Sequence, residues 1–218
     1  KMTNYPNTKI HNTLPKILRH RSVSMPDTVA LRDKDLGIWN EITWKQYNNN
    51  VSYLALALSK RGFKTGDVIG LIGDNKPSWL YFELAAQAVG GMSLGIYRDT
   101  LDEEVGYLIN AAKVNFVYAE DQEQVDKILT IKRPKNSQIT MFYEDSRGLK
   151  ELNDPHIVDM LELMNEGQAI ANKTPNKYNQ MIDKVSDKQE AILCTTSGTT
   201  SNPKLAMLPG GKFVEHVL

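Results

Sequence analysis

Residues 68–96 read VIGLIGDNKPSWLYFELAAQAVGGMSLGI, and this stretch decides the fold. Val68–Ile72 is apolar throughout, which is typical of a strand covered on both faces. Pro77 suits the first turn of a helix, which the glycine pair after Val89 should end. Met92–Ile96 is a second apolar run of strand length. A buried strand, a helix and another buried strand in this order predict a parallel sheet.

Short apolar or β-branched runs alternate with helical runs on both sides of this unit. After Thr43, apolar residues recur at steps of three or four, which predicts a capped helix that ends before Gly62. Thr100 and Glu103 form a capping-box pattern at the start of another helix. The other expected elements are strands at 29–32, 38–43, 114–119, 138–143 and 190–195, a helix at 122–129, and a mostly helical stretch at 146–187 with boundaries near Pro155 and Pro175. The predicted fold class is α/β, with a mostly parallel sheet flanked by helices.

Composition narrows the function classes. The 218 residues hold 26 Lys and Arg against 26 Asp and Glu, so nothing favours a strongly basic nucleic-acid surface, and no nucleic-acid partner is expected. Cys194 is the single cysteine, which excludes an internal disulfide and fits a reducing cytoplasm. The four histidines lie too far apart for zinc-ligand spacing. The longest apolar run, Tyr53–Leu58, is far below the roughly 20 residues that span a bilayer. We therefore expect a cytoplasmic chain without a transmembrane segment.

The segment that carries chemistry follows the last expected strand. Residues 196–204 read TSGTTSNPK, with five hydroxyl side chains, a glycine and a lysine in nine positions. Hydroxyls and backbone N–H groups after a buried strand can bind a polyphosphate, and Lys204 can stabilise negative charge on its oxygens. The alternative is an ordinary Ser/Thr-rich surface turn. Neither a Walker loop nor a Gly-x-Gly-x-x-Gly fingerprint occurs in the chain, so P-loop NTPases and Rossmann dehydrogenases lose their main support.

This loop resembles the phosphate-binding signature of the adenylate-forming (AMP-forming) acyl-CoA synthetase superfamily, Thr-Ser-Gly-Ser/Thr-Thr-Gly-x-Pro-Lys-Gly. Seven of the first nine positions match, Asn202 occupies the free one, and Ser201 replaces a glycine. The resemblance extends over roughly residues 10–218, and it is closest to long-chain fatty acid–CoA ligases. Outside the loop, the resemblance is carried by Ile42–Trp44, Gly66–Val68 and Asn75–Trp79. The stretch from Gly95 through Val125 looks most like long-chain fatty acid–CoA ligases.

The resemblance implies that residues 1–218 are the N-terminal portion of the AMP-binding (adenylation) domain, incomplete and without the C-terminal domain. The implied reaction joins a fatty acid to the α-phosphate of ATP, releases pyrophosphate, and transfers the acyl group to coenzyme A. ATP, Mg²⁺ and coenzyme A are the implied cofactors and substrates, and no metal ligand is assigned within the chain. The residues implied to hold the β- and γ-phosphates of ATP are Thr196, Ser197, Gly198, Thr199, Thr200 and Lys204. A fatty substrate also allows peripheral membrane contact, although no basic amphipathic helix in the sequence supports it.

Several departures from the family pattern limit this implication. Ser201 and Leu205 each replace a glycine, which would cost roughly 1–2 kcal/mol if the site needs a positive φ. Pro209 and the glycine pair after it should delay the next helix. The family's Tyr-Gly-x-Thr-Glu segment has no counterpart, so we expect no catalysis from these 218 residues alone. The alternative function is a noncatalytic nucleotide- or partner-binding relative with a degenerate phosphate loop.

Three other features have simpler interpretations. Trp79, Tyr81 and Phe82 have the spacing of a packed helix rather than a docking face. Cys194 lies in an apolar strand without a basic neighbour in sequence, so a buried, inert thiol is expected. His156 beside Asp154 is expected in an exposed turn rather than at an acid–base site.

Overall fold

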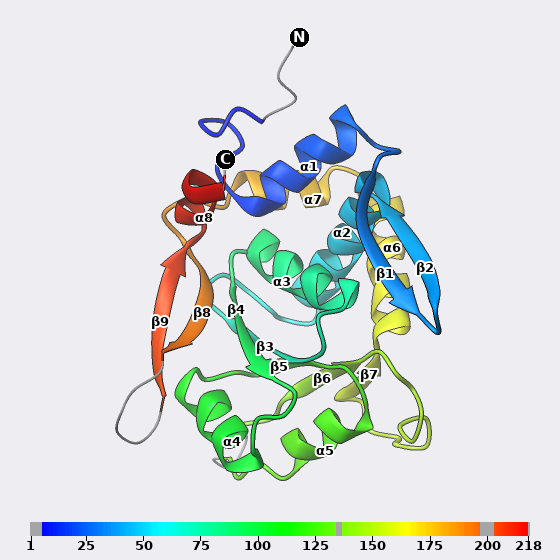
Figure 1. The fold of residues 1–218 in the computed structure, drawn as a ribbon, viewed down its shortest axis with the longest axis vertical. Helices are drawn as coiled ribbons and strands as arrows, with labels where there is room; N and C mark the ends of the chain where they lie inside the picture. Colours follow the sequence, from blue (N-terminus) through cyan, green and yellow to red (C-terminus); the bar gives the residue numbers. More distant parts are fainter. Residues whose placement is uncertain (1–5, 134–136, 197–202, 218) are drawn as a thin grey trace.

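The computed structural model describes residues 6–133, 137–196 and 203–217. The α/β fold is confirmed, with a seven-stranded sheet in the order β7-β6-β5-β3-β4-β8-β9 and a separate two-stranded hairpin, β1–β2 (Figure 1). The strands are β1 Val29–Asp35, β2 Ile38–Thr43, β3 Val68–Gly73, β4 Met92–Tyr97, β5 Phe116–Ala119, β6 Thr140–Tyr143, β7 Ile157–Asp159, β8 Glu190–Thr196 and β9 Lys204–Pro209. The helices are α1 Leu14–Ser24, α2 Trp44–Lys60, α3 Pro77–Val89, α4 Asp102–Ala111, α5 Gln122–Leu129, α6 Met160–Lys173, α7 Lys177–Asp183 and α8 Gly210–Val217.

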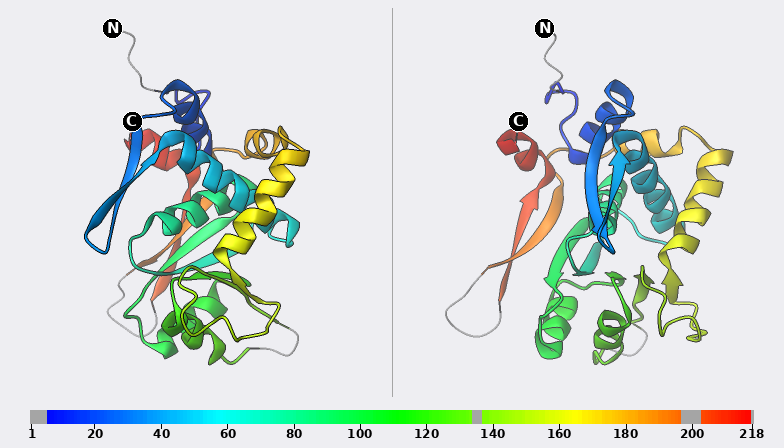
Figure 2. Two further views of the ribbon diagram at one scale, coloured as in Figure 1. Left: turned by 90° about the vertical axis from the view of Figure 1, so that its right-hand side faces the viewer. Right: turned by 45° about the vertical axis from the view of Figure 1, so that its right-hand side comes forward.

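Helices cover both faces of the main sheet (Figure 2). On one face α3 packs against the sheet, and α2 packs on α3 and on α6. This face holds a core that includes Leu54, Phe82 and Phe142. On the other face α4 and α5 enclose a second core that includes Ile109 and Val125. The strands from β7 to β8 pair in parallel, and only β9 runs antiparallel to its neighbour. The expected mostly parallel sheet is therefore confirmed.

Local sequence signals account for most element ends. The Thr43 Oγ1 accepts a hydrogen bond from the Gln46 N–H at 3.2 Å, and the Thr43 N–H donates to Gln46 Oε1 at 2.8 Å, so a full capping box starts α2. Gly90 ends α3 in the left-handed region with a φ of +93°, which glycine adopts without strain. The strand–helix–strand unit predicted at 68–96 is thus confirmed as β3, α3 and β4.

Three predictions about local structure are wrong. Thr100 does not cap α4, because its N–H bonds to the Tyr97 carbonyl in a turn and the helix begins only after Leu101. Within 146–187 the expected helices are present as α6 and α7, which lie between and after Pro155 and Pro175, but the prediction missed a short strand, β7, at the sheet edge. The three residues of β7 are too few for a periodic pattern. The glycine pair does not delay the last helix, because the Gly210 and Gly211 N–H groups bond to carbonyls before β8 and α8 starts at Gly210.

In the described ranges, no helix combines the length and the apolar character needed to cross a membrane.

Candidate functional site

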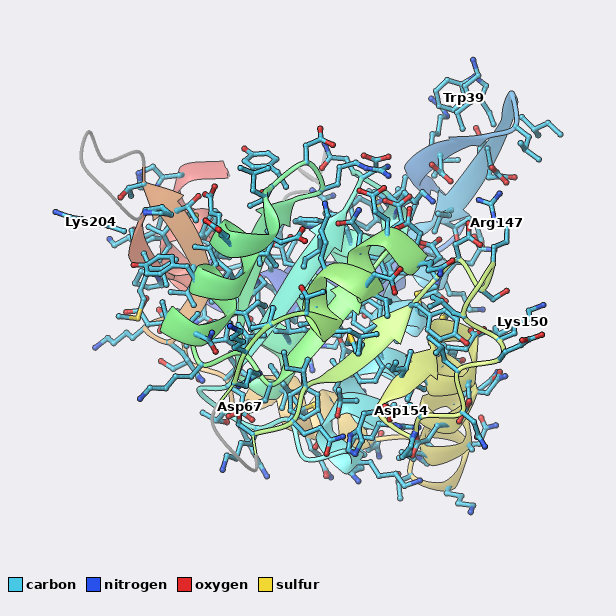
Figure 3. The ribbon with its side chains drawn as sticks, turned by 90° about the horizontal axis from the view of Figure 1, so that it is seen from below. Trp39, Asp67, Arg147, Lys150, Asp154 and Lys204 are labelled. Carbon is cyan, nitrogen blue, oxygen red and sulfur yellow. The ribbon has the colours of Figure 1, made fainter. Side chains whose placement is uncertain are left out.

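The carboxyl ends of β3 and β4 form the topological switch point of the sheet. The chain leaves β3 toward α3 on one face, and it leaves the neighbouring β4 toward α4 on the other. Two loops that diverge from adjacent parallel strands leave a crevice between them, and ligands of open α/β sheets bind there. In Figure 3, Asp67 and Asp154 precede strands and lie at the lower edge, whereas Arg147, which follows β6, lies nearer the upper edge. The upper, carboxyl edge is therefore where a site is expected.

A cavity of about 570 Å³ lies at this switch point. Its walls come from the ends of β3, β4 and β8 and from one side of α3. The lining residues are Leu71, Gly73, Asp74, Asn75, Trp79, Glu83, Ser93, Gly95, Ile96, Tyr97, Arg98, Asp99, Ile192, Leu193, Cys194 and Thr195. Its size is in the range that accommodates a small-molecule ligand.

The rim of the cavity is held by ion pairs around Glu120, whose side chain is only 7% exposed. The Glu120 carboxylate lies 2.8 Å from Lys76 Nζ and accepts a hydrogen bond from the Asp74 N–H at 2.6 Å. Arg98 Nη1 pairs with the Asp74 carboxylate at 2.7 Å across the mouth. Burial opposes the charge of Lys76, but the hydrogen bond to Glu120 and the charge of Glu144 outweigh it and raise the pKa of Lys76. At the rim, the positive charges of Lys76 and Arg98 are therefore paired with the negative charges of Glu120 and Asp74.

A second polar cluster supports the first turn of α3 behind this rim. The Ser78 and Tyr118 hydroxyls lie 2.8 Å apart, and both donate to the same Glu144 oxygen, at 2.6 and 2.7 Å. Ser78 and Tyr118 are buried, so each hydrogen bond satisfies a group that water does not reach. Burial, together with the neighbouring Glu144 charge, raises the pKa of Tyr118 above its usual range. This cluster joins the carboxyl ends of β5 and β6 to α3.

The inner wall includes residues that sequence reasoning missed or interpreted differently. Glu83 lines the cavity from α3, and burial raises the pKa of its carboxyl group. Cys194 is partly exposed and lines the cavity from β8, so the expectation of a buried thiol is wrong. The prediction failed because only one face of β8 is buried: Ala191 and Leu193 are buried, whereas Ile192 and Cys194 on the other face are half-buried. Tyr81 and Phe82 are buried in the core as expected, whereas Trp79 lies on the cavity wall.

His156 lies in a turn, as expected, but the turn leads into strand β7 rather than a helix, and His156 is half-buried rather than exposed. Its N–H donates to Asp154 Oδ1 at 2.8 Å, and its ring Nδ1 lies 3.3 Å from Thr140 Oγ1. Both contacts belong to the amino edge of the sheet, away from the cavity, so they give no acid–base pair at the candidate site.

The predicted phosphate loop leaves the sheet beside the cavity. Thr196 ends β8, directly after cavity residue Thr195, and pairs in register with Lys204 at the start of β9. Both are exposed, and Figure 3 shows Lys204 at the outer edge of the sheet, pointing away from the body. The other predicted phosphate-binding residues, Ser197, Gly198, Thr199 and Thr200, lie outside the described residues, and so does Ser201.

Leu205 has an ordinary place in the structure. It pairs with Thr195 in the β8–β9 ladder and packs against the core under α4. Of the described residues other than glycine, only Leu36 and Lys113 have a positive φ, so Leu205 carries no left-handed strain. The backbone penalty considered for this substitution does not arise.

Across the described residues, no group of three His, Cys, Asp or Glu side chains could hold a metal ion. The carboxylates at the rim are engaged instead by Lys76 and Arg98. Within the described part of the chain, the side chains therefore do not form a resident metal site.

The sequence matches the family described as "AMP-binding enzyme" over residues 18–218. Among curated proteins, it is 29% identical to the long-chain-fatty-acid–CoA ligase ACSBG2 of Rattus norvegicus, over 90% of this chain and 29% of that protein. It is also 29% identical to the long-chain-fatty-acid–CoA ligase ACSBG1 of Homo sapiens, over 84% of this chain and 24% of that protein. The chain thus spans less than a third of the length of these relatives.

Solved structures share the fold. The anthranilate–CoA ligase AuaEII in complex with anthranoyl-AMP has a TM-score of 0.76 at 16% identity, covering 98% of this chain and 37% of that one. The luciferase-like enzyme of the mealworm Zophobas morio has a TM-score of 0.76 at 15% identity, covering 97% and 45%. At these identities the likeness concerns the fold, which is that of adenylate-forming enzyme domains.

Proposed function

Because the chain belongs to the AMP-binding enzyme family, we propose that the polypeptide carrying it activates a long-chain fatty acid with ATP and transfers the acyl group to coenzyme A. The observation that carries this proposal is the hydroxyl-rich segment 196–204, which leaves the carboxyl end of β8 beside the switch-point cavity. The names of the curated relatives support the choice of a fatty acid over other carboxylic acids.

In this proposal, the segment from Thr196 to Lys204 holds the β- and γ-phosphates of ATP. Its backbone N–H groups and hydroxyls would donate to phosphate oxygens while negative charge moves to the departing pyrophosphate, and Lys204 would balance that charge. Mg²⁺ would arrive with ATP and neutralise part of the triphosphate charge. We also propose residues 1–218 as the N-terminal portion of the adenylation domain and the cytoplasm as its location.

Pyrophosphate exchange in the polypeptide that carries these residues tests the proposal. Lys204→Ala should lower palmitate-dependent exchange about a hundredfold, as expected for losing a charge that stabilises the transition state. Lys212→Ala is the matched control, because Lys212 is exposed and pairs only with Glu215 on the surface of α8. Equal exchange by both variants and the parent would contradict the role of Lys204.

The same assay separates the ligase from the noncatalytic alternative. Ser201→Gly restores the family residue within the loop and should raise exchange if the loop works in catalysis. Parent and variant that both show no exchange, while the folded protein still binds ATP, would favour a noncatalytic relative with a degenerate loop.

A further inference from the structure

A groove of about 570 Å³ opens at the amino edge of the sheet, away from the candidate site. It lies between the segment that precedes β3 and one side of α7. Its lining residues are Ser59, Gly62, Phe63, Lys64, Thr65, Val89, Lys177, Gln180, Met181, Lys184, Val185 and Gln189. Gly62–Thr65 precede β3 and Gln189 precedes β8, whereas the switch-point cavity lies at the carboxyl ends of the same strands. The two sites are therefore at opposite edges.

The charge of this groove is entirely positive. Lys64, Lys177 and Lys184 line it, and no carboxylate does. Throughout the described part of the chain, none of these three ammonium groups has a recorded hydrogen bond or ion pair. By contrast, the neighbouring cations at the end of α2 are paired: Lys60 and Arg61 lie 2.6 and 2.8 Å from Glu166. The three lysines are thus available to an external anion.

Two acidic residues close in sequence to the groove lysines are already engaged. The Asp67 carboxylate accepts a hydrogen bond from the backbone N–H of Lys64 at 2.9 Å. Asp183, at the end of α7, pairs with Arg19 of α1 at 2.8 Å. Neither carboxylate lines the groove, so neither cancels its charge from within.

Packing of α7 brings these charges together from distant parts of the sequence. Tyr178 and Ile182 are buried, and they fix how α7 is rotated against the rest of the molecule. Lys177 begins α7 and Lys184 is its C-cap with a helical backbone, so the two lysines, seven residues or two helical turns apart, lie on the same side. Lys64 comes from the loop after α2, more than one hundred residues earlier. No single basic helix exists in the sequence, but a basic surface exists in the fold.

We propose that this groove docks the protein on an anionic phospholipid bilayer. Lysine ammonium groups are compact point charges that suit mobile headgroup phosphates and carboxylates, whereas bidentate recognition of one fixed partner favours arginine. Met181, Val185 and Val89 give the groove half-buried apolar walls that can contact the glycerol region of a lipid. The choice of a bilayer over another anionic surface rests on the proposed function, since a long-chain fatty acid is supplied from membranes.

Vesicle co-sedimentation tests the proposal without ATP or turnover. The protein should bind vesicles of phosphatidylserine and phosphatidylcholine mixed at roughly 1:3, and should not bind pure phosphatidylcholine. Replacing the three lysines by Gln (K64Q/K177Q/K184Q) should weaken binding about 10- to 100-fold, because each lysine near an anionic surface adds to the attraction. Raising the salt to about 0.5 M should release the parent protein, since screening shortens the reach of exposed charges.

Two control variants separate charge from damage to the fold. K64R/K177R/K184R keeps the charges and should bind like the parent. K34Q/K45Q/K150Q removes three exposed lysines that do not line the groove and should bind within about twofold of the parent, because salt screens exposed charges that are not at the docked surface. Thermal unfolding of each variant checks that the fold is kept.

Two results would overturn the proposal. One is equal vesicle binding by the Gln triple variant and the parent. The other is that the parent protein does not bind phosphatidylserine vesicles. If, in addition, the parent binds inorganic phosphate and the Gln triple variant does not, the groove takes a soluble phosphate ligand instead. Pyrophosphate exchange is measured without membranes, so failure of the proposed ligase activity would be seen separately from failure of docking.

Discussion

At the scale of single residues, Glu120 organises the rim of the candidate site. Its buried carboxylate binds Lys76 and the Asp74 N–H at once, and Gly73 passes close above it with a φ of +156°. A Cβ on Gly73 would lie 2.7 Å from the Glu120 Cβ, so the glycine is required for this approach. The rim thus depends on one buried charge that keeps two partners.

We predict that Glu120→Gln lowers the free energy of unfolding by about 2 kcal/mol. The amide offers one acceptor where the carboxylate offers two, so either the Lys76 ammonium or the Asp74 N–H loses its partner. Urea denaturation measures the loss. Glu123→Gln is the control, because Glu123 is 61% exposed and should change stability by less than about 0.5 kcal/mol. Equal stability of the two variants would contradict the role of Glu120.

Glu83 supports a prediction about pH. Burial raises the pKa of its carboxyl above the ordinary value of 4.5, so the ionised form is less stable in the folded protein than in the unfolded chain. Protonated Glu83 therefore makes its full contribution to the free energy of unfolding below about pH 4.5. This contribution is lost as the pH rises through the pKa of Glu83 in the folded protein. Glu83→Gln should therefore raise the free energy of unfolding at pH 7 and leave it unchanged near pH 4.

Chemical denaturation at the two pH values measures this difference. Exposed Glu151 is the control, and Glu151→Gln should have the same small effect at both. A Glu83→Gln variant that is less stable than the parent at pH 7 would show that the carboxylate has a stabilising partner instead.

At the scale of elements, the packing of α6 on α2 depends on Gly167. A Cβ at this position would lie 1.8 Å from the Tyr53 carbonyl oxygen, so the two helices approach more closely than any other side chain allows. Glu166, the preceding residue, pairs with Lys60 and Arg61 at the carboxyl end of α2. Close backbone contact and ion pairing at one crossing fix α6 over the face that α2 covers.

Gly167→Ala should lower the free energy of unfolding by about 2–3 kcal/mol, because the methyl group must push the helices apart. Gly106→Ala in α4 is the matched helical control. The nearest atoms to its Cβ belong to Ile131 at 3.8 Å, so the methyl group fits and the variant should gain about 0.5–1 kcal/mol from better helix propensity. Thermal unfolding of both variants compares them, and a neutral Gly167→Ala would contradict the close crossing.

At the scale of the whole molecule, one sheet joins two cores and places two features at opposite edges. The switch-point cavity is lined from the carboxyl ends of β3, β4 and β8, and the lysine-lined groove is lined by residues that precede β3 and β8; Figure 1 shows how these strands lie side by side in the sheet. The proposed adenylation chemistry and the proposed membrane docking therefore use different residues.

We predict that the 218 residues alone form no acyl-hydroxamate from ATP, palmitate and hydroxylamine. They contain no Tyr-Gly pair, so the family segment built around Tyr-Gly-x-Thr-Glu is not among them. An active long-chain fatty acid–CoA ligase in parallel reactions controls for the assay. Product formation by the chain itself would contradict the prediction and would show that the described site suffices for adenylation.

The sequence alone determined the elements and their pairing in the centre of the sheet. Apolar runs at β3 and β4, with Pro77 and Gly90 bounding the helix between them, are local signals, and the chain follows them closely. The hydroxyl-rich segment was also readable, because the order of residue types along a short loop is itself the signal. Local signals failed at β7, where the strand has only three residues, and at Thr100, where a capping-box pattern is present but the helix starts after Leu101.

Only the tertiary structure decided which distant residues meet. Glu83 and Cys194 share a cavity wall because α3 and β8 flank β4, and neither position has a sequence signal for that contact. Lys64 likewise lines one groove with Lys177 and Lys184, although more than one hundred residues separate it from them in the sequence. The physical reason is that helices, strands and turns depend on residues that are neighbours in the sequence. Which residues form a surface or a site depends instead on the order of the strands in the sheet.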